Sequence, residues 1–85
     1  MITVFLHPKA QKELNNFPAK FRRQITDQLH ALEKCDHPLQ HPRVIKLQGG
    51  EGHDYRLRAG SYRIKFTLRG KEVLVTHVHD RKVGY

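Results

Sequence analysis

The first part of the chain carries apolar side chains at the spacings of one strand and one short helix. The β-branched and aromatic run Ile2–Leu6 predicts a strand. Ala10, Leu14 and Phe17 then recur at i, i+4 and i+7, which is the spacing of one helical face. Pro8 lies directly before this stripe and suits the first turn of a helix. We therefore expect a strand followed by a short helix.

A second apolar stripe predicts a longer helix from about Ala19 to Lys34. Asn16 is a candidate for the residue that caps this helix, and Phe17 is an equal candidate by position. The two helices would form a hairpin packed on a sheet. The apolar face consists of Phe21, Ile25, Gln28, Leu29 and Leu32.

The second half of the chain alternates between apolar and polar residues, which is the period of strands. Strands are predicted at about Asp54–Ala59, Ser61–Leu68 and Glu72–Val78. Gly60 and Gly70 lie in the short turns between them, so the three strands should form an antiparallel meander. The preceding segment "CDHPLQHPR" predicts a loop, and "VIKL" predicts a short strand or an extended lead-in.

The alternation gives the predicted meander two different faces. Apolar residues occupy one side of the strands, including all the aromatic residues of the meander, and this side should face the core. The opposite side carries a group of cations. These elements in the order β-α-α-β-β-β predict a single α+β domain over residues 1–85, with both helices on one face of a sheet of about four strands. The cations are Arg56, Arg58, Arg63 and Lys65.

The distribution of charge narrows the choice of partner. The formal net charge is +8. Residues 1–42 contain six Lys/Arg and four Asp/Glu, a net of +2, whereas residues 43–85 contain ten and four, a net of +6. A concentrated cationic surface attracts polyanions, and nucleic acid is the commonest of these. An acidic protein partner, or a surface kept basic only for solubility, are the alternatives.

The sequence lacks the signals of membrane segments, disulfides and metal sites. No apolar run approaches the roughly 20 residues of a membrane helix, and Ile2–Leu6 is too short for a signal peptide, so a cytoplasmic protein without membrane contact is expected. The single cysteine, Cys35, can form no internal disulfide. The pair His77 and His79 has no obvious third metal ligand, so neither a metal nor another cofactor is expected.

Several motifs together resemble the RelE/ParE superfamily of bacterial and archaeal toxins, and within it the mRNA-cleaving RelE branch. They include "FPAKFRRQI", "VIKLQG", "YRLRAGSYRIKF" and the ending "HVHDRKVGY". The resemblance covers almost the whole chain. It departs from the family at Asp54, where some members have a lysine, and at Asp80, where many have a histidine.

The resemblance implies a function. RelE toxins enter the ribosomal A site, where they contact mRNA and 16S rRNA and cut the mRNA without a metal. An acidic, helical antitoxin holds them inactive, and operator DNA would be bound only through the toxin–antitoxin complex. Carried over by position, the catalytic residues are Arg56, Arg63, Arg81 and Tyr85.

The chemistry of metal-free RNA cleavage suits these residue types. Arginine is always charged and binds phosphate through two N–H groups, so Arg81 first and Arg63 second are expected to stabilise charge on the phosphorus. Arg56 would orient the scissile phosphate, and Tyr85 would act as general acid or base. His53 and His79 are rival acid/base candidates. Further RNA contacts are expected from Lys46, Arg58, Lys65 and Lys82.

Two other functions stay open at this point. A ParE-like protein would inhibit DNA gyrase and cut no RNA, although that branch generally lacks the full set of catalytic residues. A non-catalytic basic module could bind RNA or an acidic protein. Because the aromatic residues of the sheet are expected to face the core, no stacking platform for single-stranded bases is predicted.

Overall fold

The computed structural model describes residues 1–48 and 52–80. The elements follow the predicted order within an α+β domain, and residues 44–46 form a strand of their own. They are β1 (Thr3–Leu6), α1 (Pro8–Asn15), α2 (Ala19–Glu33), the 3-10 helix η1 (Pro38–Gln40), β2 (Val44–Lys46), β3 (Asp54–Ala59), β4 (Tyr62–Arg69) and β5 (Glu72–Asp80).

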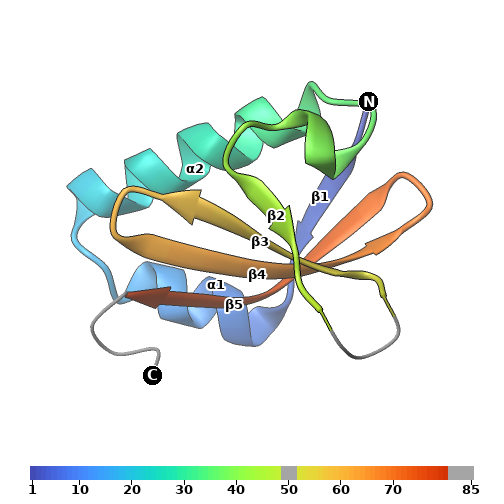
Figure 1. Ribbon diagram of the computed structural model, residues 1–85. Coiled ribbons are helices and arrows are strands. Elements are labelled where there is room, and N and C mark those ends of the chain that lie inside the picture. Colours follow the sequence, from blue (N-terminus) through green and yellow to red (C-terminus); the bar gives the residue numbers. More distant parts are fainter. Residues whose placement is uncertain (49–51, 81–85) are drawn as a thin grey trace.

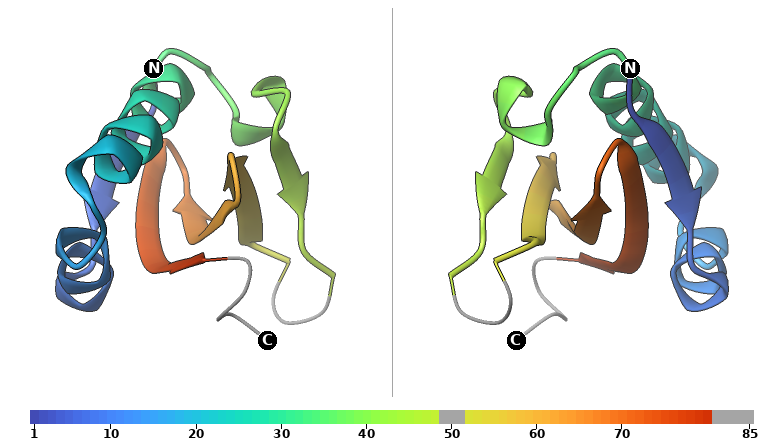
Figure 2. Two further views of the ribbon diagram at one scale, coloured as in Figure 1. Left: turned by 90° about the vertical axis from the view of Figure 1, so that its left-hand side faces the viewer. Right: turned by 90° about the vertical axis from the view of Figure 1, so that its right-hand side faces the viewer.

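All five strands belong to one sheet in the order β1-β5-β4-β3-β2 (Figures 1 and 2). The meander is antiparallel as predicted, and β2 extends it by pairing antiparallel with β3. β1 pairs parallel with β5 at the other edge. The expectation of about four strands was one short, because residues 44–46 form a full edge strand and not only an extended lead-in.

Both helices begin beside a proline, and the boundary between them differs from the expectation. Pro8 opens α1, as predicted. The N-cap of α2 is Pro18, which makes no side-chain cap, so the assignment to Asn16 or Phe17 was wrong. The carbonyl of Pro18 accepts the first bonds of α2, from the N–H groups of Phe21 and Arg22 at 3.0 Å each. Asn16 ends α1 instead, where its N–H bonds to carbonyls of the last turn.

The core lies between the helices and the apolar face of the meander. Ile25 and Leu32 of α2 are fully buried, as are Leu57, Ile64 and Phe66 of the sheet. Ala10, Leu14 and Leu29 are also buried, as predicted, whereas Phe17, Phe21 and Gln28 of the predicted stripes are only partly buried. Within residues 1–48 and 52–80, no helix is long and apolar enough to cross a membrane.

The aromatic residues of the meander are buried, as the alternation predicts. Tyr55 stacks on Phe66 with ring centroids 5.6 Å apart, and Phe17 and Phe21 pack on Tyr62 at 4.7 and 5.3 Å. The first contact joins β3 to β4, and the other two fasten α2 and its entry to β4. The expectation that all aromatics of the sheet face the core fails only at β1.

The β3–β4 turn is tightly fitted to α2. Gly60 has φ +61°, which L side chains rarely adopt. A Cβ atom there would also lie 2.6 Å from the side chain of Gln24 on α2. The backbone conformation of the turn thus favours glycine, whereas the end of the flexible Gln24 side chain could move aside; the turn fixes the register of β3 against β4.

Three histidines serve as local caps, each directly before a proline. His7, His37 and His41 each accept a hydrogen bond at Nδ1 from the N–H two residues later, at 3.0–3.1 Å. Proline pushes the residue before it into extended backbone, and there the short reach of Nδ1 can act as an Asp or Asn side chain would. His7 and His37 are exposed, whereas His41 is buried.

His41 makes the folded state sensitive to acid. It is buried, and this burial, followed by the charge of Arg43, lowers the pKa of its imidazole. The unfolded chain takes up a proton near pH 6.5, whereas the folded chain resists it, so stability should fall as the pH falls below about 6.5. In His41→Asn, Oδ1 can keep the cap, and thermal unfolding between pH 7.5 and 5 should show a smaller loss than in the wild type. Equal losses would contradict this role.

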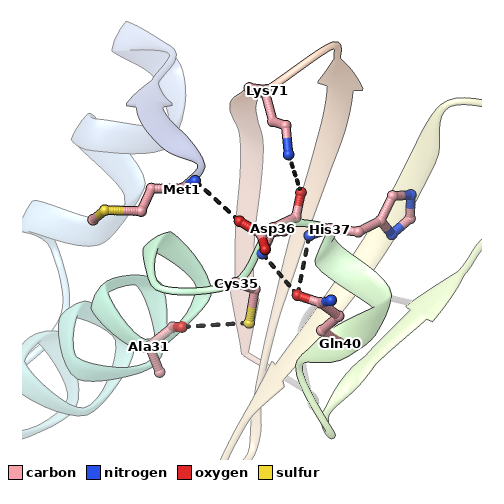
Figure 3. A network of polar contacts seen from close by, with 7 residues as sticks. All are labelled: Met1, Ala31, Cys35, Asp36, His37, Gln40 and Lys71. Carbon is pink, nitrogen blue, oxygen red and sulfur yellow. Dashed lines mark hydrogen bonds and ion pairs between the residues drawn. The ribbon is translucent and has the colours of Figure 1, made fainter.

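A surface network joins the start of β1 to the loop after α2 (Figure 3). Asp36 lies at its centre: its carboxylate accepts from the Met1 ammonium at 3.2 Å, and its carbonyl accepts from Lys71 Nζ at 3.0 Å. Gln40 Oε1 accepts from the N–H groups of Asp36 and His37, at 2.7 and 3.3 Å. The contacts are exposed, so each adds little stability, but together they fix the segment leading to β2.

Candidate nucleic-acid interface

The sheet register brings the predicted cations together in two cross-strand rows on the face away from the helices. In the first row, Arg56 lies opposite Lys65, and Lys65 lies opposite His77. In the second row, Arg58 lies opposite Arg63, and Arg63 lies opposite His79. We call these two rows the cationic rungs. They span β3, β4 and β5, and they bring together five of the predicted site residues.

This arrangement is unfavourable for folding alone. Side chains directly opposite in an antiparallel pair have Cβ atoms about 4.5–5.5 Å apart, and like charges there are destabilising. Arg56 faces Lys65 and Arg58 faces Arg63 at this separation. The cations of each rung therefore repel one another. A polyanion that bridges both rungs would reduce this repulsion.

Removal of one positive charge from the rungs should raise folding stability but weaken the binding of a polyanion. In Lys65→Gln, the loss of like-charge repulsion should raise the free energy of unfolding by a few tenths of a kcal/mol. If the rungs bind a polyanion, the affinity for a test RNA should fall in the same variant, and its dependence on salt should become less steep. Lys12→Gln is the control, since Lys12 lies in the last turn of α1, where a cation favours the helix. Denaturant unfolding and RNA titrations would test both effects. A Lys65 variant that is less stable than the wild type would contradict the repulsion.

The β5 end of the rungs carries a pair of stacked imidazoles held by α1. His77 and His79 have ring centroids 5.3 Å apart. Glu13 of α1 accepts from the N–H of Val78 at Oε1, at 3.3 Å, and its Oε2 lies 3.6 Å from Nδ1 of His79. Because β1 pairs only with the first half of β5, α1 occupies the edge beyond it. The Glu13 carboxylate thus lies beside the Nδ1 atom of His79.

Burial and neighbouring charges lower the pKa of His77. Burial lowers the pKa of this imidazole, and the neighbouring His79, Lys9 and Lys65 lower it further, while Glu13 opposes them. An uncharged imidazole therefore lies beside the cations at neutral pH. An anion bound over the rungs should favour its protonated form.

Some predicted site residues lie away from the rungs. Lys46 pairs with Tyr55, whose side chain is in the core, so the register places Lys46 on the other face of the sheet. His53 is exposed just before β3, next to Leu68 of β4, at the end of the strands far from Arg58. Predicted residues Arg81, Lys82 and Tyr85 lie outside the described residues.

Two neighbours of the rungs were not predicted from the sequence. Ile45 lies directly opposite Arg56 and extends the first rung onto β2, with 49% of its surface exposed. Arg43 is joined to the second rung, because its carbonyl accepts from the N–H of Arg58 at 3.1 Å. Both could have been found if residues 44–46 had been taken as a strand, since odd positions there share the face of Arg56.

The open face also has an apolar end. Phe5 of β1 and Leu74 of β5 lie opposite each other and are 48% and 40% exposed. Together with Thr67, Arg69 and Glu72 they line a hollow of about 490 Å³. Phe5 contradicts the expectation that every aromatic residue of the sheet faces the core. The face of Phe5 could not be told from the sequence, because four residues of β1 carry too short an alternation.

No metal centre is visible in residues 1–48 and 52–80, where no three His, Cys, Asp or Glu side chains are grouped as ligands. The side chains that could act chemically here are guanidinium, ammonium and imidazole groups. This set can bind phosphate through paired N–H donors and can move protons near neutral pH.

Comparisons with known proteins agree on the fold. No family model and no curated protein matches the chain. A chain of the archaeal RelE–RelB complex from Pyrococcus horikoshii is similar at 27% identity, with a TM-score of 0.77 and 98% of each chain covered. The isolated RelE toxin of E. coli is similar at 22% identity and TM-score 0.71, covering 94% of this chain and 84% of that one.

A more distant toxin–antitoxin complex has the same fold. A chain of the YoeB–YefM complex from Staphylococcus aureus matches at 14% identity and TM-score 0.71, with 92% of this chain and 94% of that one covered. At this identity the likeness concerns the fold alone. The resemblance inferred from the sequence is thus confirmed: the chain has the fold of the RelE-type toxins of the RelE/ParE superfamily.

Proposed function

We propose that this protein is the toxin of a type II toxin–antitoxin pair and that it cleaves mRNA in the ribosomal A site. The observation that carries the proposal is the pair of cationic rungs on the open face of a RelE fold. Like charges lie opposite each other in both rungs, and a phosphate backbone laid across them would reduce their repulsion.

The proposed reaction is attack by the 2′-OH on the adjacent phosphorus. The hydroxyl loses its proton, the new O2′–P bond forms, the P–O5′ bond breaks, and the leaving O5′ gains a proton. Arg63 lies in the middle of the second rung, where its guanidinium can stabilise charge that develops on the phosphorus. Arg56 orients the scissile phosphate, while Arg58 and Lys65 hold the flanking backbone.

Residues after β5 complete the proposed site. Arg81 directly follows the strand that carries His79, and we assign it the main role in charge stabilisation. Tyr85 and His79 are the candidates for proton transfer. The position of His79 beside Arg63, with its Nδ1 side turned to Glu13, supports its candidacy over that of His53.

The same reasoning extends to partners. An acidic, helix-rich antitoxin would neutralise the rungs, and its apolar side chains could fill the hollow beside Phe5 and Leu74. Several similar structures are described as complexes of RelE with RelB. Ribosomal RNA would be the second polyanion met by the toxin, and operator DNA would be bound only by the complex with the antitoxin.

Two assays separate this function from gyrase inhibition. Purified protein is added to a translation reaction with a defined mRNA, and cut sites are read by primer extension for the wild type and for Arg81→Ala. We expect cuts with the wild type and none with the variant. Intact mRNA together with inhibited DNA supercoiling by gyrase would replace the proposal with a ParE-like function.

A further inference from the structure

A hollow at the β2–β3 edge combines three arginines with an exposed apolar surface. It measures about 450 Å³, within the size range of small-molecule sites. It adjoins the cationic rungs but extends beyond them onto β2. Its lining consists of Pro42, Arg43, Ile45, Arg56 and Arg58.

From this lining we propose that the hollow binds one nucleotide of single-stranded RNA, with the base against Ile45 and Pro42 and the phosphate on the arginines. Guanidinium groups bind phosphate through two N–H donors and also stack on flat rings. An apolar side chain beside them accepts the face of any base. Ile45 lines the same hollow as the three arginines and is 49% exposed, so the hollow offers an apolar surface that phosphate alone would not contact.

The backbone around Arg43 is fixed before any ligand arrives. Its N–H donates to Nδ1 of buried His41 at 3.0 Å, and its carbonyl accepts from the N–H of Arg58 at 3.1 Å. Pro42 stiffens the residue between them. The ordering cost of binding is therefore confined largely to side chains, which favours a specific site over a diffuse basic surface.

The place of the hollow fits a nucleotide beside the cut. It lies at the β2 end of the rungs, whereas Arg63 and His79 lie toward β5. Adjacent strands are about 4.8 Å apart, so the hollow and Arg63 are separated by about one to two strand spacings. An RNA strand crossing the sheet would pass from one to the other. This inference rests on the proposed function for its RNA partner, but the hollow can be tested without a ribosome.

The test is a titration of the protein with AMP, followed by backbone amide NMR, with inorganic phosphate and adenosine as separate probes. We expect AMP to shift the signals of Arg43, Ile45 and Arg58 and to bind more tightly than either probe. Ile45→Thr, which keeps β-branching on the edge strand, should weaken AMP binding about three- to tenfold and leave phosphate binding unchanged. Arg43→Gln should weaken binding of both.

Matched controls lie at the other end of the same face. Leu74→Thr replaces an apolar residue of similar exposure, and Arg69→Gln removes one arginine of β4. Leu74→Thr should leave AMP affinity unchanged. Arg69→Gln should lower it only by the amount expected from the loss of one positive charge at the same salt concentration. Equal loss in Ile45→Thr and Leu74→Thr, or equal binding of AMP and inorganic phosphate, would overturn the nucleotide site.

Failure of this inference can be told apart from failure of the proposed function. If wild-type protein cuts mRNA on ribosomes but AMP does not shift the NMR signals of the hollow, the proposed nucleotide site is wrong and the proposed activity is supported. If AMP binds as expected and no mRNA is cut, the nucleotide site is supported and the proposed mRNA cleavage is wrong. In an active protein, Ile45→Thr should also redistribute the cut sites among sequence contexts, whereas Leu74→Thr should not.

Discussion

Arg63→Gln should reduce mRNA cleavage on the ribosome by about 10²–10³-fold. Removal of one donor aimed at developing charge costs this much in other enzymes, and Arg63 is the central residue of the second cationic rung. The loss should appear in the single-turnover rate at saturating ribosome concentration, because the interaction strengthens as charge develops on the phosphorus.

Arg69→Gln is the matched control for this experiment. Arg69 lies on the same strand, β4, and its replacement removes the same charge from the chain, but it is opposite Glu72 and outside the rungs. We expect its single-turnover rate to stay within a few-fold of the wild type, with a change confined to salt-dependent binding. Equal losses in the two variants would show that Arg63 contributes only through the net charge of the protein.

Phe66→Ala should have the largest effect on stability, about 3–5 kcal/mol. Phe66 is fully buried on β4 and stacks on Tyr55, at the point where the register between β4 and β5 shifts. Domains of this size are stable by roughly 4–13 kcal/mol, so the variant should lose between about a quarter and all of its stability.

Chemical denaturation would measure this loss against a surface control. Leu74→Ala, on the neighbouring strand and 40% exposed, should cost less than about 1 kcal/mol. If the alanine variant of Phe66 is folded and as stable as that of Leu74, the Phe66 side chain cannot occupy the core, and the register of β4 against its neighbours is wrong.

Much of the fold was predictable, because the alternation typical of strands and the apolar stripe typical of helices are clear where the elements are long. Alternation over Tyr62–Phe66 gave the face of each residue on β4, and the stripe through Ile25 and Leu32 gave α2. The short edge strand β2 and the start of α2 were harder. Three residues show too little alternation to separate a strand from an extended loop, and Pro18 begins α2 without a capping side chain.

The site was predictable in its members but not in its geometry. Arg56, Arg58, Arg63 and Lys65 could be placed on one face by counting alternate positions. Which cation lies opposite which depends on the register of β3 against β4, which the Gly60 turn sets, and the positions of the two histidines depend on the β4–β5 register with its bulge after Lys65.

Contacts between elements distant in the chain were beyond sequence reasoning. Glu13 reaches the β5 edge only because β1 ends early and α1 takes its place, 65 residues away from Val78 in the chain. The hollow beside Ile45 likewise depends on the pairing of β2 with β3, which no local pattern of three residues can specify.

Cleavage of mRNA by this protein should occur only within a ribosome. The most direct test incubates the wild-type protein with one defined mRNA, once free in solution and once bound by ribosomes with an empty A site, and maps the 5′ ends that appear. We expect cuts at the A-site codon in the ribosome-bound sample and intact RNA in the other. Equal cutting of free RNA, or no cutting in either sample, would contradict ribosome-dependent cleavage.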